Sequence, residues 1–282
     1  MFPVLFQNET LLIPTWHVFF LLAVLAALVA IIRQHAKQEQ RAGSQHKQIS
    51  RQDLLYLYCW AYAGAYLGAR WLSVAIEQKE ELVGVWNLQG VWNLLLAGFS
   101  VGPMTFYGGL LGGAAAGWFY LRWRNLAVAE TADVVVPAIF LGLAIGRIGC
   151  FLNGDDYGGE VALLGGREVP WWAVKFPNHD LQIYRYPVQL WESFAGFAIY
   201  ILAYSNYRRE WLRQQPGLLS LITILVYGTV RFFLEFWRDD PRGWLLLPAL
   251  STSQGISLAI ILIVGFTIVR RGNDSRGGAL TL

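Results

Sequence analysis

Charged residues and cysteines are scarce in this sequence. Of its 282 residues, 15% are charged and two are cysteines, Cys59 and Cys150. Both cysteines fall inside long apolar stretches, a pattern that excludes a disulfide framework and a paired-cysteine metal site. Metal-ligand spacing is equally missing from the four histidines, which are His17, His35, His46 and His179. The sequence therefore predicts no metal site, and we expect no cofactor.

An internal repeat and a cleavable leader are also missing. Inverted-repeat transporters show weak internal symmetry, and none is found here. The segment from Met1 to Thr10 lacks the basic stretch of a signal peptide, and the apolar run that follows is long enough to span a bilayer. We therefore expect a retained first helix, and transport is the least expected function.

Apolar and aromatic residues are present in excess. Hydrophobic residues make up 55% of the chain, its mean hydropathy is +0.40, and it holds 13 Trp, 13 Tyr and 16 Phe. A spanning helix needs roughly 20 apolar residues, and seven stretches come near that length: 13–32, 54–76, 106–121, 132–152, 187–205, 217–237 and 254–269. The sequence predicts an all-α integral membrane protein in which about seven transmembrane helices form one domain over residues 1–282.

The distribution of lysine and arginine predicts the orientation of the chain, because cytoplasmic loops carry an excess of both residues. One set of alternate loops and the C-terminal tail hold thirteen: Arg33, Lys37, Arg41, Lys47, Arg51, Arg122, Arg124, Arg208, Arg209, Arg213, Arg270, Arg271 and Arg276. The other loops hold five: Lys79, Arg167, Lys175, Arg185 and Arg242. We therefore expect the N-terminus outside and the C-terminus inside. Residues 153–186 then form a small periplasmic cap or, alternatively, an ordinary interfacial loop.

Four arginines lie within or at the edge of the apolar stretches, namely Arg70, Arg147, Arg231 and Arg238. A charged side chain at the centre of a membrane helix costs about 2.5 to 3.5 kcal/mol on insertion scales, so such residues face protein or a watery cavity. The carboxylates available as partners are Glu192 and Glu235, with Asp155 and Asp156 just beyond the fourth stretch. We expect these arginines to be paired inside the bundle.

Two segments gather polar groups. Tyr227, Arg231, Glu235 and Arg238 are spaced to share one helix face. That stripe suits a lipid phosphate, although an ion ladder that joins helices is the alternative. The segment 146–158 combines four glycines with a cation, an amide and a carboxylate, which predicts an anion-binding loop or, alternatively, a tight helix-ending turn with an ion pair.

These segments resemble the bacterial prolipoprotein diacylglyceryl transferase family. The family's hallmark, of the type GRxGNFxNxExxG, is similar to residues 146–158 with two substitutions, Cys150 and Asp155. Similar segments follow in family order at 68–70, 107–110, 186–192, 227–238 and 251–254. The resemblance covers nearly the whole chain, agrees with seven helices and an outer N-terminus, and implies a multi-pass protein of the bacterial cytoplasmic (inner) membrane.

The resemblance also implies a reaction. The family moves a diacylglyceryl group from phosphatidylglycerol to the thiol of a lipobox cysteine in a preprolipoprotein, which leaves glycerol phosphate. We therefore expect phosphatidylglycerol or a similar anionic phospholipid as partner, with a lipobox segment as acceptor and no nucleic acid. By this resemblance, Arg147 and Arg231 hold the lipid phosphate. The residues expected to shape the headgroup site are Arg70, Asn153, Asp155, Gly158, Gln189, Glu192, Tyr227, Glu235 and Arg238.

The residue that activates the acceptor departs from the family pattern. Family members usually carry histidine where Tyr107 stands and tyrosine where His17 stands. An imidazole, with an ordinary pKa of about 6.5, accepts a proton at neutral pH more readily than a phenol, with about 10. We hypothesise that His17 and Tyr107 have exchanged sides of one catalytic cavity. The alternative is that His17 is an ordinary interfacial side chain.

Two further functions are compatible with the same residues. A divergent homologue would bind the lipid but use another acceptor or another lipid. A non-catalytic lipid-binding protein would keep the arginines and lack the base at position 107. Assay of thioether-linked lipid and glycerol phosphate separates these functions from the transferase.

Overall fold

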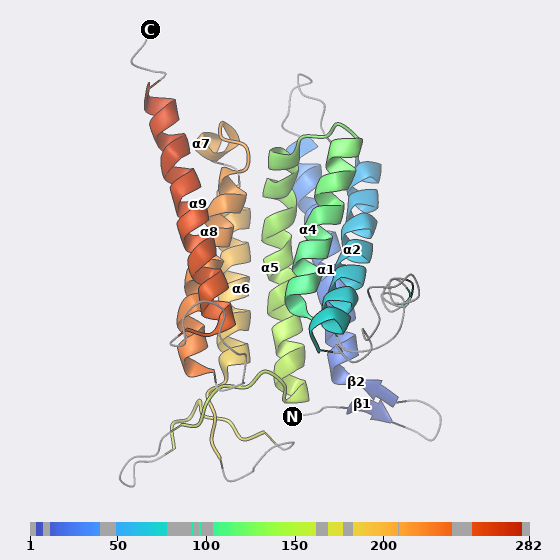
Figure 1. Ribbon diagram of the computed structural model, residues 1–282, viewed down its shortest axis with the longest axis vertical. Helices are drawn as coiled ribbons and strands as arrows, with labels where there is room; N and C mark the ends of the chain where they lie inside the picture. The colour runs from blue at the N-terminus through green and yellow to red at the C-terminus, as the bar shows by residue number, and fades with distance from the viewer. Residues whose placement is uncertain are drawn as a thin grey trace. The chain divides into compact units, whose positions relative to one another are not determined.

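The computed structural model describes residues 4–7, 12–39, 49–77, 92, 96, 104–161, 169–176, 183–207, 209–238 and 250–277. Long helices dominate these ranges (Figure 1). In chain order the elements are β1 (Val4–Gln7), β2 (Leu12–Pro14), α1 (Thr15–Glu39), α2 (Arg51–Glu77), α4 (Phe106–Trp123), α5 (Val128–Asn153), α6 (Val188–Asn206), α7 (Glu210–Arg213), α8 (Leu218–Leu234), η3 (Glu235–Trp237) and α9 (Thr252–Gly277).

Four helical segments in the described ranges are long and apolar enough to cross a membrane: Thr15–Ala36, Val128–Asn153, Leu218–Trp237 and Thr252–Asn273. The chain is thus a helical, multi-pass membrane protein. Each of the seven apolar stretches predicted from sequence contains a helix, and the crossing of the membrane by all seven stays a prediction. Glycines and amphipathic aromatic residues interrupt the apolar character of α2 and α4.

The N-terminal part differs from the prediction that a helix begins at residue 13. Residues Leu12–Pro14 form strand β2, which pairs antiparallel with β1, and α1 begins at Thr15. Because proline lacks an amide hydrogen, it is tolerated at an element boundary and disfavoured inside a helix. Pro14 therefore marks the change from strand to helix.

The described residues fall into two compact units, Met1–Gln34 with Ala132–Leu282, and His35–Thr131. In the second unit, α2 and α4 pack through glycines. A Cβ atom at Gly112 would overlap the carbonyl oxygen of Gly64, and one at Gly108 would overlap that of Gly68. Such small residues let membrane helices approach closely.

This seam makes a matched pair of substitutions informative. Gly112→Ala is expected to destabilise the α2–α4 hairpin by about 1 to 3 kcal/mol, because its methyl group has no room. Gly109→Ala places the same methyl group 3.4 Å from Ala65 O, an ordinary contact, and should be neutral or stabilising by roughly 0.5 to 1 kcal/mol. Denaturation of both variants in detergent measures the difference. Equal stability would mean that the two helices are not packed along Gly112.

In the first unit, small residues join the helices that carry the polar cluster described below. A Cβ at Gly142 of α5 would lie 3.3 Å from Ala23 O of α1, and one at Gly196 of α6 would lie 3.0 Å from Phe140 O of α5. The Ser193 hydroxyl donates to Ala144 O at 2.8 Å. The backbones of α1, α5 and α6 are thus held in close contact.

The start of α8 is fixed by a carboxylate from α5. Asp133 accepts hydrogen bonds from the backbone amides of Gly217 and Ser220 at 2.7 and 2.8 Å, and from the Ser220 hydroxyl at 2.7 Å. The first amides of a helix lack partners within the helix, so Asp133 supplies the missing acceptors. This anchor positions α8, whose opposite end bears Arg231.

Candidate functional site

Arg147 lies in the last two turns of α5 and is paired with two carboxylates. Its Nη1 lies 2.6 Å from Asp156 Oδ2, and its Nε lies 2.9 Å from Glu192 Oε2. The same Nη1 lies 4.0 Å from the sulfur of Cys150. The side chain is 13% exposed. The predicted pairing of this arginine inside the bundle is confirmed.

Glu192, in the second turn of α6, is the centre of the cluster. Its side chain is fully buried. The Tyr227 hydroxyl of α8 donates to Oε1 at 2.7 Å, while Oε2 faces Arg147 and, at 3.8 Å, Arg238 Nη1. One carboxylate therefore links α5, α6, α8 and the segment after η3.

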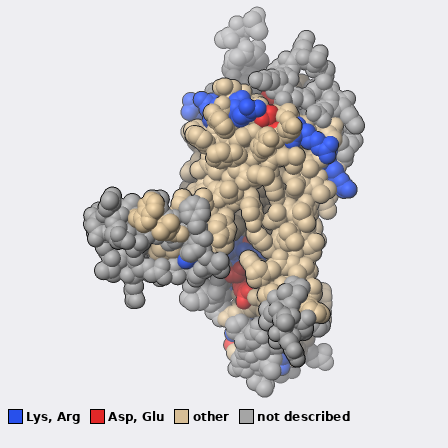
Figure 2. Space-filling model, turned by 90° about the vertical axis from the view of Figure 1, so that its right-hand side faces the viewer, with Lys and Arg blue, Asp and Glu red and all other residues tan. Residues whose placement is uncertain are grey.

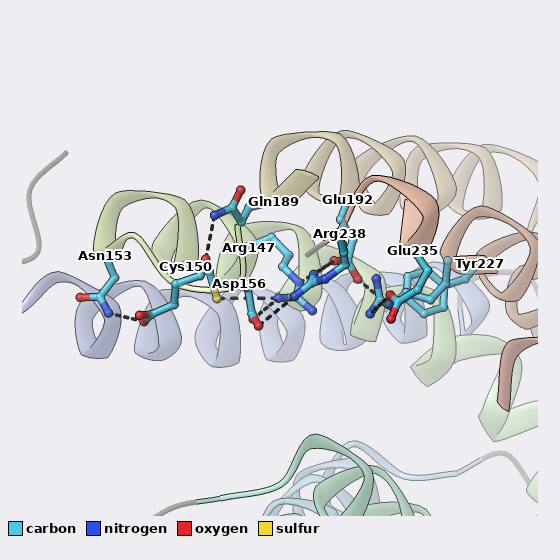
Figure 3. A network of polar contacts seen from close by, with 11 residues as sticks. Arg147, Cys150, Asn153, Asp156, Gln189, Glu192, Tyr227, Glu235 and Arg238 are labelled. Atoms are coloured by element: carbon cyan, nitrogen blue, oxygen red, sulfur yellow. Dashed lines mark hydrogen bonds and ion pairs between the residues drawn. The ribbon is translucent and has the colours of Figure 1, made fainter. Parts of the chain in front are cut away.

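Arg238 reaches this cluster by a route that helix periodicity does not predict. The helix α8 ends at Leu234, the 3-10 turn η3 follows, and Arg238 has an extended backbone. It forms an antiparallel bridge with Gly158, and its Nη2 lies 2.9 Å from Asp156 Oδ1. The expectation that Arg238 extends the helical stripe is therefore wrong. Figure 3 shows Arg147, Asp156, Glu192 and Arg238 pointing toward one another.

Arg231 belongs to a second, adjoining chain of contacts. Its Nη2 lies 2.8 Å from Glu235 Oε2, and the Ser251 hydroxyl donates to Glu235 Oε1 at 2.9 Å. Ser251 and Gln254 exchange hydrogen bonds at the start of α9, which is the reciprocal arrangement of a capping box. The end of α8 is thus held against the start of α9, and the ion-ladder alternative accounts for the Arg231–Glu235 pair.

The cluster as a whole balances three guanidinium groups, Arg147, Arg231 and Arg238, against three carboxylates, Asp156, Glu192 and Glu235. Figure 2 shows blue and red atoms together amid a broad tan surface. Arg231 Nη1 is buried and has no hydrogen-bond partner among the residues that the structure describes. In those same ranges no group of three or more His, Cys, Asp or Glu could hold a metal ion.

The loop that leaves α5 contributes a carboxylate to the cluster. Asn153 donates to the carboxylate of Asp155, whereas the neighbouring carboxylate of Asp156 contacts the arginines. Gln189, which is fully buried, donates to Asp155 O at 2.7 Å. Gly154 has a φ of 88°, as a turn with positive φ requires. A Cβ at Gly158 would lie 2.5 Å from Tyr186 O, so this position needs glycine.

The described part of the segment predicted as a cap, residues 153–161, 169–176 and 183–186, forms short backbone bridges. Arg185 pairs with both Glu160 and Val174. The rings of Trp172 and Tyr186 are stacked, with their centroids 5.4 Å apart. Trp191 packs edge-on against both Trp172 and Trp237. These rings lie next in sequence to the cluster, beside Glu192 and Arg238. The periplasmic location of the segment stays a prediction.

Three further residues predicted for the site, Arg70, Tyr107 and His17, are described by their own surroundings. Arg70 is buried and Tyr107 half-buried, and both belong to the second unit, His35–Thr131. Tyr107 packs edge-on against Phe106. His17 belongs to the first unit, is exposed, and packs edge-on against Trp16 at 5.2 Å. The exchange of His17 and Tyr107 stays a hypothesis.

Two residues of the cluster were not predicted as site residues, Asp156 and Ser251. The family motif leaves position 156 unspecified, and the prediction placed the acidic role on its neighbour Asp155. Ser251 to Gln254 reads S-T-S-Q, the signature of a capping box at the start of a helix. That signature is the signal that could have identified Ser251.

Comparison with known proteins identifies the family of this chain. The family model described as prolipoprotein diacylglyceryl transferase matches residues 3–270. A protein of Clostridium tetani named phosphatidylglycerol–prolipoprotein diacylglyceryl transferase is 30% identical over 266 residues, which is 93% of this chain and 94% of that protein. A protein of the same name from Rhodospirillum rubrum is 32% identical over 79% of this chain and 78% of its own length.

A third relative matches over a shorter region. The protein of that name from Chlorobaculum tepidum is 34% identical over 165 residues. These residues make up 58% of this chain and 53% of that relative, so the chain spans about half of the relative's length. The match to the family model, by contrast, runs through both units and through every residue of the cluster. The chain therefore belongs to the prolipoprotein diacylglyceryl transferase family.

Proposed function

We propose that this protein transfers the diacylglyceryl group of phosphatidylglycerol to the cysteine thiol of a prolipoprotein. In this reaction the sulfur forms a bond to the glyceryl carbon, and the bond from that carbon to the phosphate oxygen breaks. The thiol proton passes to a base, and glycerol phosphate leaves with the bonding electrons. The step needs cationic groups where negative charge accumulates on the departing phosphate.

The cluster of three arginines at the ends of apolar helices carries this proposal. Guanidinium groups bind phosphate oxygens through paired N–H donors. Arg147 and Arg238 share the carboxylate of Asp156, which is an anion in the position where a phosphate would be bound. Arg231 adds a buried Nη1 donor that no described residue uses. We assign Arg147, Arg231 and Arg238 to the phosphate, and Asn153, Gly158, Gln189, Tyr227 and Glu235 to the walls of this site.

The proposed topology brings this site to the side where an exported acceptor arrives. With seven spans and the N-terminus outside the inner membrane, the C-terminal ends of α5 and α8 and the start of α6 all lie at the periplasmic surface. Arg147, Arg231 and Glu192 belong to these three ends. The segment 153–186 then covers the site as a cap. We further propose that His17 or Tyr107 receives the thiol proton.

Reconstitution tests the reaction directly. Full-length protein in nanodiscs containing phosphatidylglycerol is incubated with a lipobox peptide, and mass spectrometry follows the thioether-linked diacylglyceryl peptide while an enzymatic assay follows glycerol phosphate. We expect both products in equal amounts, and neither when serine replaces the peptide cysteine. Glycerol phosphate without modified peptide would indicate another acceptor. Absence of both products would favour a non-catalytic lipid-binding protein.

A further inference from the structure

Asp156 occupies an unusual place in the cluster, because its two carboxylate oxygens are divided between two arginines. Oδ2 lies 2.6 Å from Arg147 Nη1, and Oδ1 lies 2.9 Å from Arg238 Nη2. The carboxylate therefore bridges guanidinium groups that come from α5 and from the segment after η3. A phosphate with two free oxygens would make the same bridge.

The backbone positions this carboxylate through a turn with two positive φ angles. Asp156 has a φ of 57°, two residues after Gly154 with a φ of 88°. The chain then pairs with the strand-like segment of Arg238, where the Gly159 amide donates to Trp237 O at 2.8 Å. Aspartate is among the non-glycine residues that tolerate positive φ. The loop thus places the Asp156 side chain within reach of both arginines, although the residue lies outside any helix.

Solvent exposure separates Asp156 from the other carboxylate that contacts the same arginines. The Asp156 side chain is 34% exposed, whereas those of Glu192, Arg238 and Arg147 are 0%, 2% and 13% exposed. Glu192 is enclosed by protein, so its release would leave a buried charge unpaired. Asp156 can turn into water with its charge solvated. It is therefore the carboxylate that an entering anion can replace.

Charge also predicts which anion this exchange disfavours. With Asp156 in place the cluster is neutral, three guanidinium groups against three carboxylates. A phosphate diester carries one negative charge, which restores neutrality when Asp156 swings out. A phosphate monoester carries about 1.5 to 2 negative charges at neutral pH. The monoester is the product of the proposed transfer, so the returning carboxylate would repel the product more than the substrate.

We propose that Asp156 is a specificity-determining residue that competes with phosphate for Arg147 and Arg238, so that the site accepts the lipid diester and releases the monoester product. This inference rests on the proposed function. Asp156 controls which anion is bound by Arg147 and Arg238, whereas the arginines themselves stabilise the phosphate during transfer. The residue acts through the guanidinium groups and touches neither reacting carbon nor sulfur.

Asp156→Asn tests the competition, with Glu160→Gln as the matched control. Glu160 is exposed on the same segment and bridges to Arg185 through its backbone, so its variant loses one negative charge without touching Arg147 or Arg238. For Asp156→Asn we expect the KM for phosphatidylglycerol to fall by about tenfold, the worth of one charge-assisted hydrogen bond. The inhibition constant for glycerol phosphate should fall further, and kcat should fall as product release slows. Asp156→Glu should restore both constants toward those of the wild type.

Isothermal titration of the detergent-purified protein with glycerol phosphate gives a readout that does not depend on turnover. Tighter binding to Asp156→Asn than to Glu160→Gln supports the competition even if no transferase activity is found, an outcome that would sink the proposed function alone. Unchanged or weaker binding, or a raised KM, overturns the proposal and makes Asp156 a structural clamp. If Asp156→Asn does not fold, Asp156→Ser takes its place in the titration. Glycerol phosphate binding to Asp156→Ser that is no tighter than binding to the wild type overturns the proposal in the same way.

Discussion

Arg231→Ala is expected to lower diacylglyceryl transfer by about 100-fold to 1,000-fold, the usual cost of removing one donor to the charge that develops in a transition state. Arg231 is buried and offers Nη1 to the site while Nη2 holds Glu235. Loss of the side chain removes the phosphate donor and leaves Glu235 with the Ser251 hydroxyl. The measurement is the rate of formation of thioether-linked peptide at saturating phosphatidylglycerol.

Arg231→Lys separates the catalytic effect from the structural one. An ammonium group keeps the ion pair with Glu235 but lacks the forked second donor of guanidinium. We therefore expect Arg231→Lys to retain most of the thermal stability and still lose most of the turnover. Arg270→Ala, which removes an exposed arginine near the end of α9, should leave both unchanged. Normal turnover in Arg231→Lys would show that the second donor does not contact the phosphate.

The arginine pairs illustrate what could be predicted from sequence. An arginine within an apolar helix is costly unless it is paired, and the carboxylates at comparable depth were Glu192 and Glu235. Both are found in contact with arginines. The helices themselves were equally accessible to prediction, because each apolar stretch was long enough to require one. Composition and the cost of buried charge were sufficient for these features.

The loop contacts could not be predicted in this way. Asp155 and Asp156 are adjacent in sequence, and only one of them contacts the arginines in the described part of the chain. That residue is Asp156, which has a φ of 57° and follows the turn at Gly154. The helical period of residues 227–238 predicts Arg238 on the same face as Arg231, but α8 gives way to η3, and a backbone bridge to Gly158 sets the position of Arg238. Backbone pairing between residues so far apart in the chain produces no periodic pattern in the sequence from which it could be predicted.

Glu192→Gln is expected to destabilise the protein by about 3 to 5 kcal/mol, the cost of removing one partner from a buried ion pair. The amide keeps the shape of the side chain and can still accept the Tyr227 hydroxyl, but it removes the charge that faces Arg147 at 2.9 Å and Arg238 at 3.8 Å. Tyr227→Phe removes that hydrogen bond alone and should cost about 0.5 to 1.5 kcal/mol. Equilibrium unfolding in mixed detergent micelles measures both variants.

Glu192 and Asp156 both contact Arg147 and Arg238, but their different burial predicts different effects of substitution on stability and on anion binding. Either substitution by amide raises the charge of the cluster from zero to plus one. Because Glu192 is fully enclosed and Asp156 is 34% exposed, the first change strands buried guanidinium groups, whereas water and an incoming phosphate can compensate the second. We therefore expect added glycerol phosphate to recover more stability in Asp156→Asn than in Glu192→Gln. An equally small loss of stability in Glu192→Gln and Glu160→Gln would contradict the role of Glu192 as the fixed counter-charge.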